Sequence, residues 1–142
     1  MQDKSQLDLI ISLFSNGKVQ EALDQIDPLI KDNPNDAVLF NIRGACYAHI
    51  GEPIMAMKQY EKAIEMDSNY SEAYNNLGIT FQELDELEKA LESFEIAFSL
   101  KPEKVEIISI IISILNELND PKISVDYYQK IIQNSPDQYL VH

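Results

Sequence analysis

The chain has 142 residues, 45% of them hydrophobic, with four glycines and six prolines, which is enough for one domain without low-complexity linkers. Its 24 acidic and 11 basic residues give a net charge of −13, which disfavours nucleic acid and anionic membrane surfaces and favours neutral or basic partners. A single cysteine, Cys46, excludes an intramolecular disulfide and a thiolate metal cluster.

The compartment follows from two further features of the sequence. The N-terminal residues lack a basic segment followed by an apolar one, so they do not resemble a secretion signal. No apolar run approaches the roughly 20 residues that a membrane-spanning helix needs. We therefore expect a cytoplasmic protein with no membrane contact.

Similar residues recur every 34 positions, four times, without insertion or deletion. Large residues recur at Leu13, Tyr47, Phe81 and Leu115, and again at Ile26, Tyr60, Phe94 and Tyr128, while small ones recur at Ala22, Ala56, Ala90 and Ser124. A fixed period of this length indicates a repeat architecture. The repeats are 3–36, 37–70, 71–104 and 105–138, and residues 139–142 begin a truncated fifth unit.

Each repeat is predicted to be two amphipathic helices around a turn, because apolar residues recur three or four positions apart on both sides of it. The turn residues, all of which tolerate a left-handed backbone, are Gly17, Gly51, Asp85 and Asn119. Asp36, Ser71 and Glu72 supply caps or first-turn acids to first helices. Pro53 and Pro121 fall in the first turn of second helices, where a missing N–H costs little. Eight helices in four antiparallel hairpins follow.

Small residues are expected to close the hairpins. Gly44 and Gly78 on first helices would face Ala56 and Ala90 on second helices, so that the two backbones approach closely. Tyr60, Phe94 and Tyr128 would wedge against the neighbouring repeat, with cores centred on Tyr47, Phe81, Tyr60 and Phe94. Arg43 stands where other repeats have an aliphatic residue, and we interpret it as a structural residue whose head reaches a carboxylate or carbonyl.

The stretch from Asn69 to Pro102 resembles the tetratricopeptide repeat consensus, with its large residue, Gly, second large residue, Ala, aromatic, Ala and Pro in order. The resemblance covers residues 3–138. It implies an all-α, right-handed superhelical solenoid of four helix-turn-helix repeats. In that family the first helices form a concave wall that binds a peptide or a partner helix.

By this analogy, the predicted groove is apolar towards the N-terminus and polar to acidic towards the C-terminus. Its residues are Leu7, Ile11, Phe14, Asn41, Ala45, Asn75, Asn76, Ile79, Gln82, Ser109, Ser113 and Asn116, with His49 at the rim. Asn41, Asn75 and Asn76 can clamp a peptide backbone, since an amide both donates and accepts hydrogen bonds. The alternative is that they are solvated polar residues on a helix face.

One subclass of the family grips the carboxylate of an acidic chaperone tail with Lys, Asn and Arg. Only Asn76 matches that pattern, and the basic positions are missing or acidic, so capture of an acidic tail is not expected. No motif for catalysis, cofactor or metal is present, and the run of carboxylates from Glu83 to Glu95 is interpreted as a solvated face. Cys46 is interpreted as a packing residue rather than a nucleophile.

The sequence thus predicts a non-enzymatic adaptor that binds a neutral to basic protein or peptide. The alternative is an N-terminal recruitment or dimerisation domain of a larger enzyme, such as a sulfotransferase, glycosyltransferase or hydroxylase. The first helix of the last repeat is apolar over an unusually wide arc, from Val105 to Leu118. We therefore expect the fourth repeat either to form a homodimer or to depend on residues outside this sequence.

Overall fold

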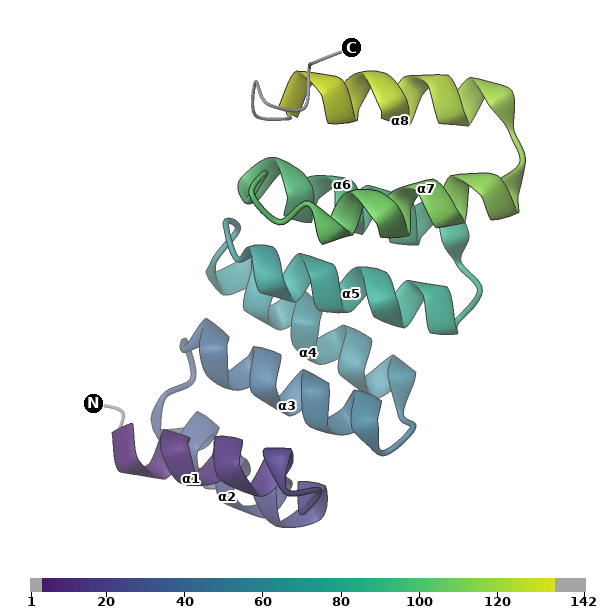
Figure 1. Ribbon diagram of the computed structural model, residues 1–142. Helices are drawn as coiled ribbons and strands as arrows, with labels where there is room; N and C mark the ends of the chain where they lie inside the picture. The colour runs from purple at the N-terminus through teal and green to yellow at the C-terminus, as the bar shows by residue number, and fades with distance from the viewer. Residues whose placement is uncertain (1–3, 135–142) are drawn as a thin grey trace. The chain divides into compact units, whose positions relative to one another are not determined.

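The computed structural model describes residues 4–134, and within them every regular element is an α-helix. The helices are α1 (Lys4–Ser15), α2 (Val19–Asp32), α3 (Ala37–His49), α4 (Pro53–Met66), α5 (Ser71–Glu83), α6 (Leu87–Leu100), α7 (Glu106–Leu118) and α8 (Pro121–Asn134) (Figure 1). They form the four helix-turn-helix repeats of an all-α repeat fold, as predicted. The chain divides into two compact units, residues 1–68 with α1–α4 and residues 69–142 with α5–α8. The predicted fifth unit, 139–142, lies outside the described residues.

The turn inside each hairpin confirms the prediction made from residue type. Gly17, Gly51, Asp85 and Asn119 have φ angles of 80°, 83°, 59° and 52°. Glycine adopts this left-handed backbone without steric cost, and Asp and Asn tolerate it better than other residues. Pro53 and Pro121 are the first residues of α4 and α8, also as predicted.

The starts of the first helices are held in two different ways. The Asp36 carboxylate accepts a hydrogen bond from the Val38 amide at 3.0 Å and so caps α3, as predicted. Ser71 differs from the expectation, because it is the first residue of α5 and does not cap it. Its buried hydroxyl instead donates to the Ala97 carbonyl oxygen at 2.9 Å, which fastens the start of α5 to the end of α6. Glu72 lies in the first turn of α5, as expected.

In each unit the close approach of two helices involves an aromatic ring rather than an alanine. A Cβ atom added to Gly44 would lie 2.6 Å from the Tyr60 ring, and one added to Gly78 would lie 2.9 Å from the Phe94 ring. Ala56 and Ala90 are fully buried as well, but the atoms nearest to the two glycines belong to these rings. The glycines leave room for an aromatic side chain of their own hairpin.

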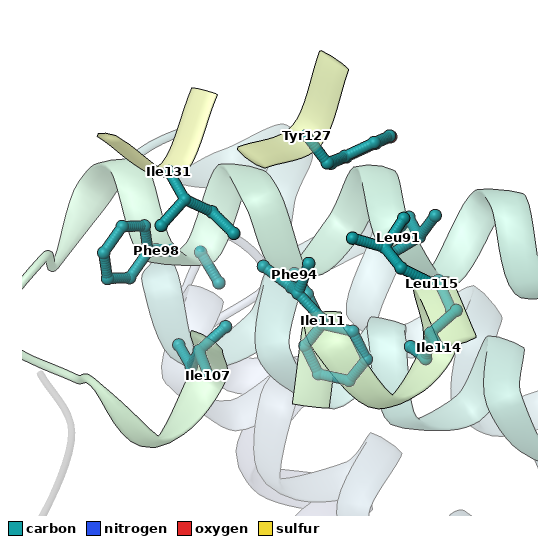
Figure 2. Close-up of a cluster of buried hydrophobic side chains, with 11 residues drawn as sticks. Leu91, Phe94, Phe98, Ile107, Ile111, Ile114, Leu115, Tyr127 and Ile131 are labelled. Carbon is teal, nitrogen blue, oxygen red and sulfur yellow. The ribbon is translucent and has the colours of Figure 1, made fainter. Parts of the chain in front are cut away.

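The core of the second unit joins three helices. Phe94, Leu91 and Phe98 of α6 pack with four aliphatic residues of α7, Ile107, Ile111, Ile114 and Leu115, and with Tyr127 and Ile131 of α8 (Figure 2). Phe94 thus serves its own hairpin and the next repeat. Most of the wide apolar arc of α7 is covered in this way, against the expectation that it stays open.

Two expectations about the core are wrong. Tyr60 and Phe94 are buried as predicted, but Tyr47 and Phe81 are only half-buried. In the fourth repeat Tyr127 is buried, at 8% exposure, whereas Tyr128, which the period places in the core, is 40% exposed. The α7–α8 hairpin is looser than the α3–α4 and α5–α6 hairpins, and α8 also rests on α6. One period earlier in α6, Ser93 and Ala97 are buried as well, so Tyr127 and Ile131 keep the register of the repeat, whereas Tyr128 lacks the cover that α7 gives Phe94.

Candidate functional site

The predicted wall of α1 and α3 in the first unit carries exposed apolar side chains. Ile11 and Val38 are largely exposed, at 45% and 40%, although both are aliphatic. Leu7 and Phe14 are half-buried beside them. The Phe14 ring meets the His49 ring edge-on with centroids 5.6 Å apart, which places His49 at the end of α3 as a rim residue. This surface suits apolar side chains of a ligand.

Asn41 differs from the other predicted residues of this wall. It is only 8% exposed, within a stretch of α3 where Leu39 and Phe40 are also buried. Asn41 also takes part in an interaction inside the structure. Ala45, one turn further on, is half-buried. At this burial, the main role of the Asn41 side chain is packing. A ligand would have to displace the side chains around Asn41 to contact its amide.

Arg43 has the structural role that the sequence indicated. Its Nε donates to Gln59 Oε1 of α4 at 2.8 Å, and its Nη1 forms an ion pair with Asp27 Oδ1 of α2 at 3.2 Å. The guanidinium also lies 5.3 Å from the centre of the Phe40 ring. Arg43 thus joins three helices of the first unit, and its guanidinium is held inside that unit.

The wall formed by α5 and α7 in the second unit is mainly polar. Ile79 is 40% exposed, and Asn75, Asn76 and Gln82 are half-buried on α5. The predicted residues on α7, Ser109, Ser113 and Asn116, are exposed. Asn76 already takes part in an interaction within the structure. Across the described residues, the side chain of Asn75 forms no hydrogen bond or ion pair, so its amide is free to bind a ligand.

A pocket of about 130 Å³ opens beside Asn75, between the N-terminal ends of α5 and α7. It is lined by Ser71, Glu72, Asn75, Lys104, Glu106, Ile107 and Ile110. Ile107 is buried and Ile110 half-buried, whereas Glu72, Glu106 and Lys104 are exposed, so the lining combines an apolar part with charged side chains at its edge. Glu72 also lies 3.8 Å from Lys101, an ion pair weakened by solvent.

Sequence reasoning placed Asn75 in the groove and expected an acidic character towards the C-terminus, but missed the rest of this pocket. Lys104 precedes α7 in the connection between repeats, and Ile107 and Ser71 are core residues of their helices. Their contribution depends on where the start of one helix meets another, which a helical period does not specify. The exposed acidic rim was the one signal in the sequence, through Glu72 and Glu106 in the first turns of α5 and α7.

The acidic run from Glu83 to Glu95 lies away from this pocket. It is exposed apart from half-buried Glu95, and Lys89 pairs with Glu86 at 2.9 Å. A shallow hollow of about 420 Å³ is lined there by residues 85–89 and Leu118. The run has the solvated character that the sequence indicated.

Cys46 is fully buried, and burial, with the nearby charge of Asp27, raises the pKa of its thiol to about 11. The thiol is therefore protonated at neutral pH, which agrees with a packing role. Within residues 4–134, no group of His, Cys, Asp and Glu side chains is arranged to hold a metal ion. No helix in the same range is both long and apolar enough to span a bilayer.

Two family models, both described as tetratricopeptide repeat, match residues 37–70 and 59–92. The first match has the bounds of the second predicted repeat. The chain belongs to the tetratricopeptide repeat family. Relatives of known identity include the Hsp70-Hsp90 organizing protein of Triticum aestivum, 29% identical over 75% of this chain, and Hsp70-Hsp90 organizing protein 1 of Glycine max, 32% identical over 75% of it. The chain spans only 18% and 19% of the length of these two proteins.

Solved structures of other tetratricopeptide repeat domains share the fold. The second such domain of human RPAP3, in complex with the HSP70 peptide SGPTIEEVD, is 27% identical with a TM-score of 0.73, over 80% of this chain and 95% of that one. The first such domain of Spaghetti (RPAP3), bound to the HSP90 peptide SRMEEVD, is 23% identical with a TM-score of 0.77, over 82% and 92% of the two chains. MamA is 22% identical with a TM-score of 0.80, over 92% and 77%.

Proposed function

We propose that this chain is a peptide-binding adaptor module whose first-helix walls hold a short segment of a partner protein. The observation that carries the proposal is the pocket at the starts of α5 and α7, where the free amide of Asn75 stands beside apolar and charged lining residues. The related domain of human RPAP3, which is in complex with an HSP70 peptide, supports the same use of the fold. Exposed Ile79 and Ile11 would add apolar contacts, each in its own unit.

The charge of the pocket favours a neutral to basic segment. Glu72 and Glu106 outnumber Lys104 at its edge, and the chain as a whole carries −13. The peptide SGPTIEEVD bound by the human RPAP3 domain has three acidic residues and no basic one. Acidic side chains placed against Glu72 and Glu106 would be repelled, so the preferred ligand should differ in charge from that peptide.

A displayed library of random peptides, selected against the immobilised chain, would test this proposal. We expect the selected peptides to carry Lys or Arg next to apolar residues. Synthetic versions should bind at least about tenfold more weakly to the variants Asn75→Ala and Glu106→Lys, because an amide contact or a favourable charge is lost. Glu88→Lys, which makes the same charge change on the exposed acidic run, is the matched control for Glu106→Lys.

Three outcomes would contradict the proposal. The library could yield no binding peptide, it could yield acidic peptides, or the selected peptides could lose affinity with Glu88→Lys and keep it with Glu106→Lys. The last result would move the site from the wall to the acidic run. Circular dichroism of each variant would show that the helices are intact.

The proposal gives the chain no catalytic step, cofactor or metal, and places it in the cytoplasm. The exposed carboxylates and the protonated Cys46 thiol support a binding role, because neither is set up to act as an acid, base or nucleophile. A free buried thiol also fits a reducing compartment. A second copy of the chain is a further proposed partner, through the fourth repeat rather than through the walls.

A further inference from the structure

An apolar stripe is exposed along α8. Val125, Tyr128 and Ile132 are 56%, 40% and 57% exposed and follow one another at helical spacing on a single face. One period earlier, α6 has Leu91, Phe94 and Phe98 at these positions, and all three are buried. In α2 the same positions hold buried apolar residues too, Leu23, Ile26 and Ile30.

The first helix of the following repeat explains the burial in α6. Leu91, Phe94 and Phe98 share one core with Ile107, Ile111, Ile114 and Leu115 of α7 (Figure 2). In the first unit, α2 is likewise in contact with α3. The stripe on α8 therefore has the composition of a helix-docking face. It matches, in residue type and position, the faces by which α6 contacts α7 and α2 contacts α3.

The stripe is separate from the face by which α8 is held. Tyr127 and Ile131 point into the core beneath α8 and are buried there, so they fix the orientation of the helix (Figure 2). Successive helical residues are 100° apart, which directs the neighbouring Tyr128 and Ile132 to a different side. The stripe therefore lies on a helix whose orientation is fixed by its buried residues.

Charge favours contact between copies at this helix. The chain carries −13, whereas α8 has two lysines and one aspartate, and Lys130 pairs with Asp126 at 3.4 Å. At 100° per residue, Asp126 and Lys130 lie on another side of the helix from the stripe, whereas Lys122 lies one turn before Val125, at the edge of the stripe. Ser124 and Gln129 flank the stripe on either side and carry no charge. Two copies can therefore approach through α8 with less repulsion than through the acidic helices.

We propose that Val125, Tyr128 and Ile132 form a homodimerisation surface, on which α8 of one copy packs antiparallel to α8 of a second copy around a two-fold axis. The stripe is self-complementary in this arrangement. An axis close to Tyr128 places Val125 of each copy opposite Ile132 of the other and brings the two Tyr128 rings together. A single helix on each side buries less than the roughly 800 Å² per partner of a standard interface, so the dimer is a weak, reversible one.

Head-to-tail packing of copies is disfavoured by the composition of α1. Three repeats before Ile107, Ile111 and Ile114 of α7, the equivalent residues of α1 are Ser5, Leu9 and Ser12. A second copy docked through α1 would set two serines against the stripe where α7 supplies isoleucines to α6. The two ends therefore do not complement each other, and the isologous pairing does not extend into a filament.

Sedimentation equilibrium of the full chain over a concentration series tests the proposal. We expect the average mass to rise from 16.2 kDa towards twice that value. The double variant Val125→Glu, Ile132→Glu should remain a monomer throughout. Ile54→Glu, an equally exposed isoleucine on α4, is the matched control and should keep the dimer. A monomeric wild type, or a dimer that survives the double variant, would overturn the proposal.

A cross-link tests the two-fold geometry without removing apolar surface at two sites. In a Cys46→Ala background, Tyr128→Cys should form a disulfide-linked dimer under mild oxidation, since the two copies of residue 128 meet near the axis. Ser99→Cys, exposed on α6, should not. Equal cross-linking of both variants would show random collision and overturn the two-fold arrangement. This inference does not depend on peptide binding, because the double variant is expected to bind selected peptides normally.

Discussion

At the scale of single residues, Gly78 is a position where the packing of the second unit leaves no room for a side chain. A Cβ atom there would lie 2.9 Å from three atoms of the Phe94 ring, which is fully buried and has no free direction in which to move. We expect Gly78→Ala to lower the free energy of unfolding by about 1–3 kcal/mol, and Gly78→Leu to lower it further. Urea titration followed by circular dichroism measures the change.

A double-mutant cycle checks the cause of that loss. Phe94→Leu by itself should destabilise the core, but it should also remove much of the penalty of Gly78→Ala, because the ring that the new methyl group meets is gone. If the losses in the free energy of unfolding are fully additive, Gly78 is needed for another reason, such as its backbone conformation.

Arg43 gives a second test at this scale, since it satisfies the side chain of a buried glutamine. Arg43→Leu removes the hydrogen bond to Gln59 Oε1 and leaves that buried oxygen without its guanidinium donor. We expect a loss of about 1–3 kcal/mol in the free energy of unfolding. The double variant Arg43→Leu, Gln59→Leu should recover most of it, because no polar atom is then left unpaired. Thermal melts of the single and double variants provide the comparison, and an unrecovered loss would point to the Asp27 ion pair instead.

At the scale of helices and turns, most of the fold could be predicted from local chemistry. Left-handed turns need Gly, Asn or Asp, and the four predicted turn residues all have positive φ. What could not be predicted depends on which helices cover each face. Tyr128 is the clearest case, because Phe94, one period earlier, is buried against the following helix α7, and none of the described helices follows α8.

The burial of Tyr127 has a consequence at alkaline pH. Burial, followed by the charges of Glu92 and Glu95, raises the pKa of its phenol from 10.0 to about 12. The unfolded chain ionises this phenol first, so its contribution to stability is complete below pH 10 and is lost as the pH rises to about 12. Tyr127→Phe should reduce the loss of stability over this window by on the order of 1 kcal/mol. Urea titrations at pH 9 and at pH 11 measure the difference, with Tyr128→Phe as the control. Equal losses in wild type and Tyr127→Phe would contradict the assignment.

At the scale of the whole molecule, the sequence predicted which helices carry the candidate site better than it predicted the site itself. Ile11, Ile79 and Asn75 are accessible on first helices, whereas Asn41, of the same residue type as Asn75 and one period before it, is buried. Periodicity assigns equivalent positions, but it does not specify how deeply neighbouring side chains cover each of them. The pocket at Asn75 forms where two helix starts and a connecting segment meet, and that meeting is a property of the folded unit.

Net charge makes the two proposed interactions respond to salt in opposite directions. Two copies of a chain of net charge −13 repel each other, and salt at 0.1 M screens charges beyond about 10 Å, so the dimer should strengthen as salt rises. Binding of a basic peptide beside Glu72 and Glu106 should weaken over the same range, because attraction is screened instead. Sedimentation equilibrium and fluorescence polarisation of a selected peptide, both measured along one salt series, would show the divergence. A dimer that weakens with salt would indicate that ion pairs, rather than the apolar stripe of α8, hold the copies together.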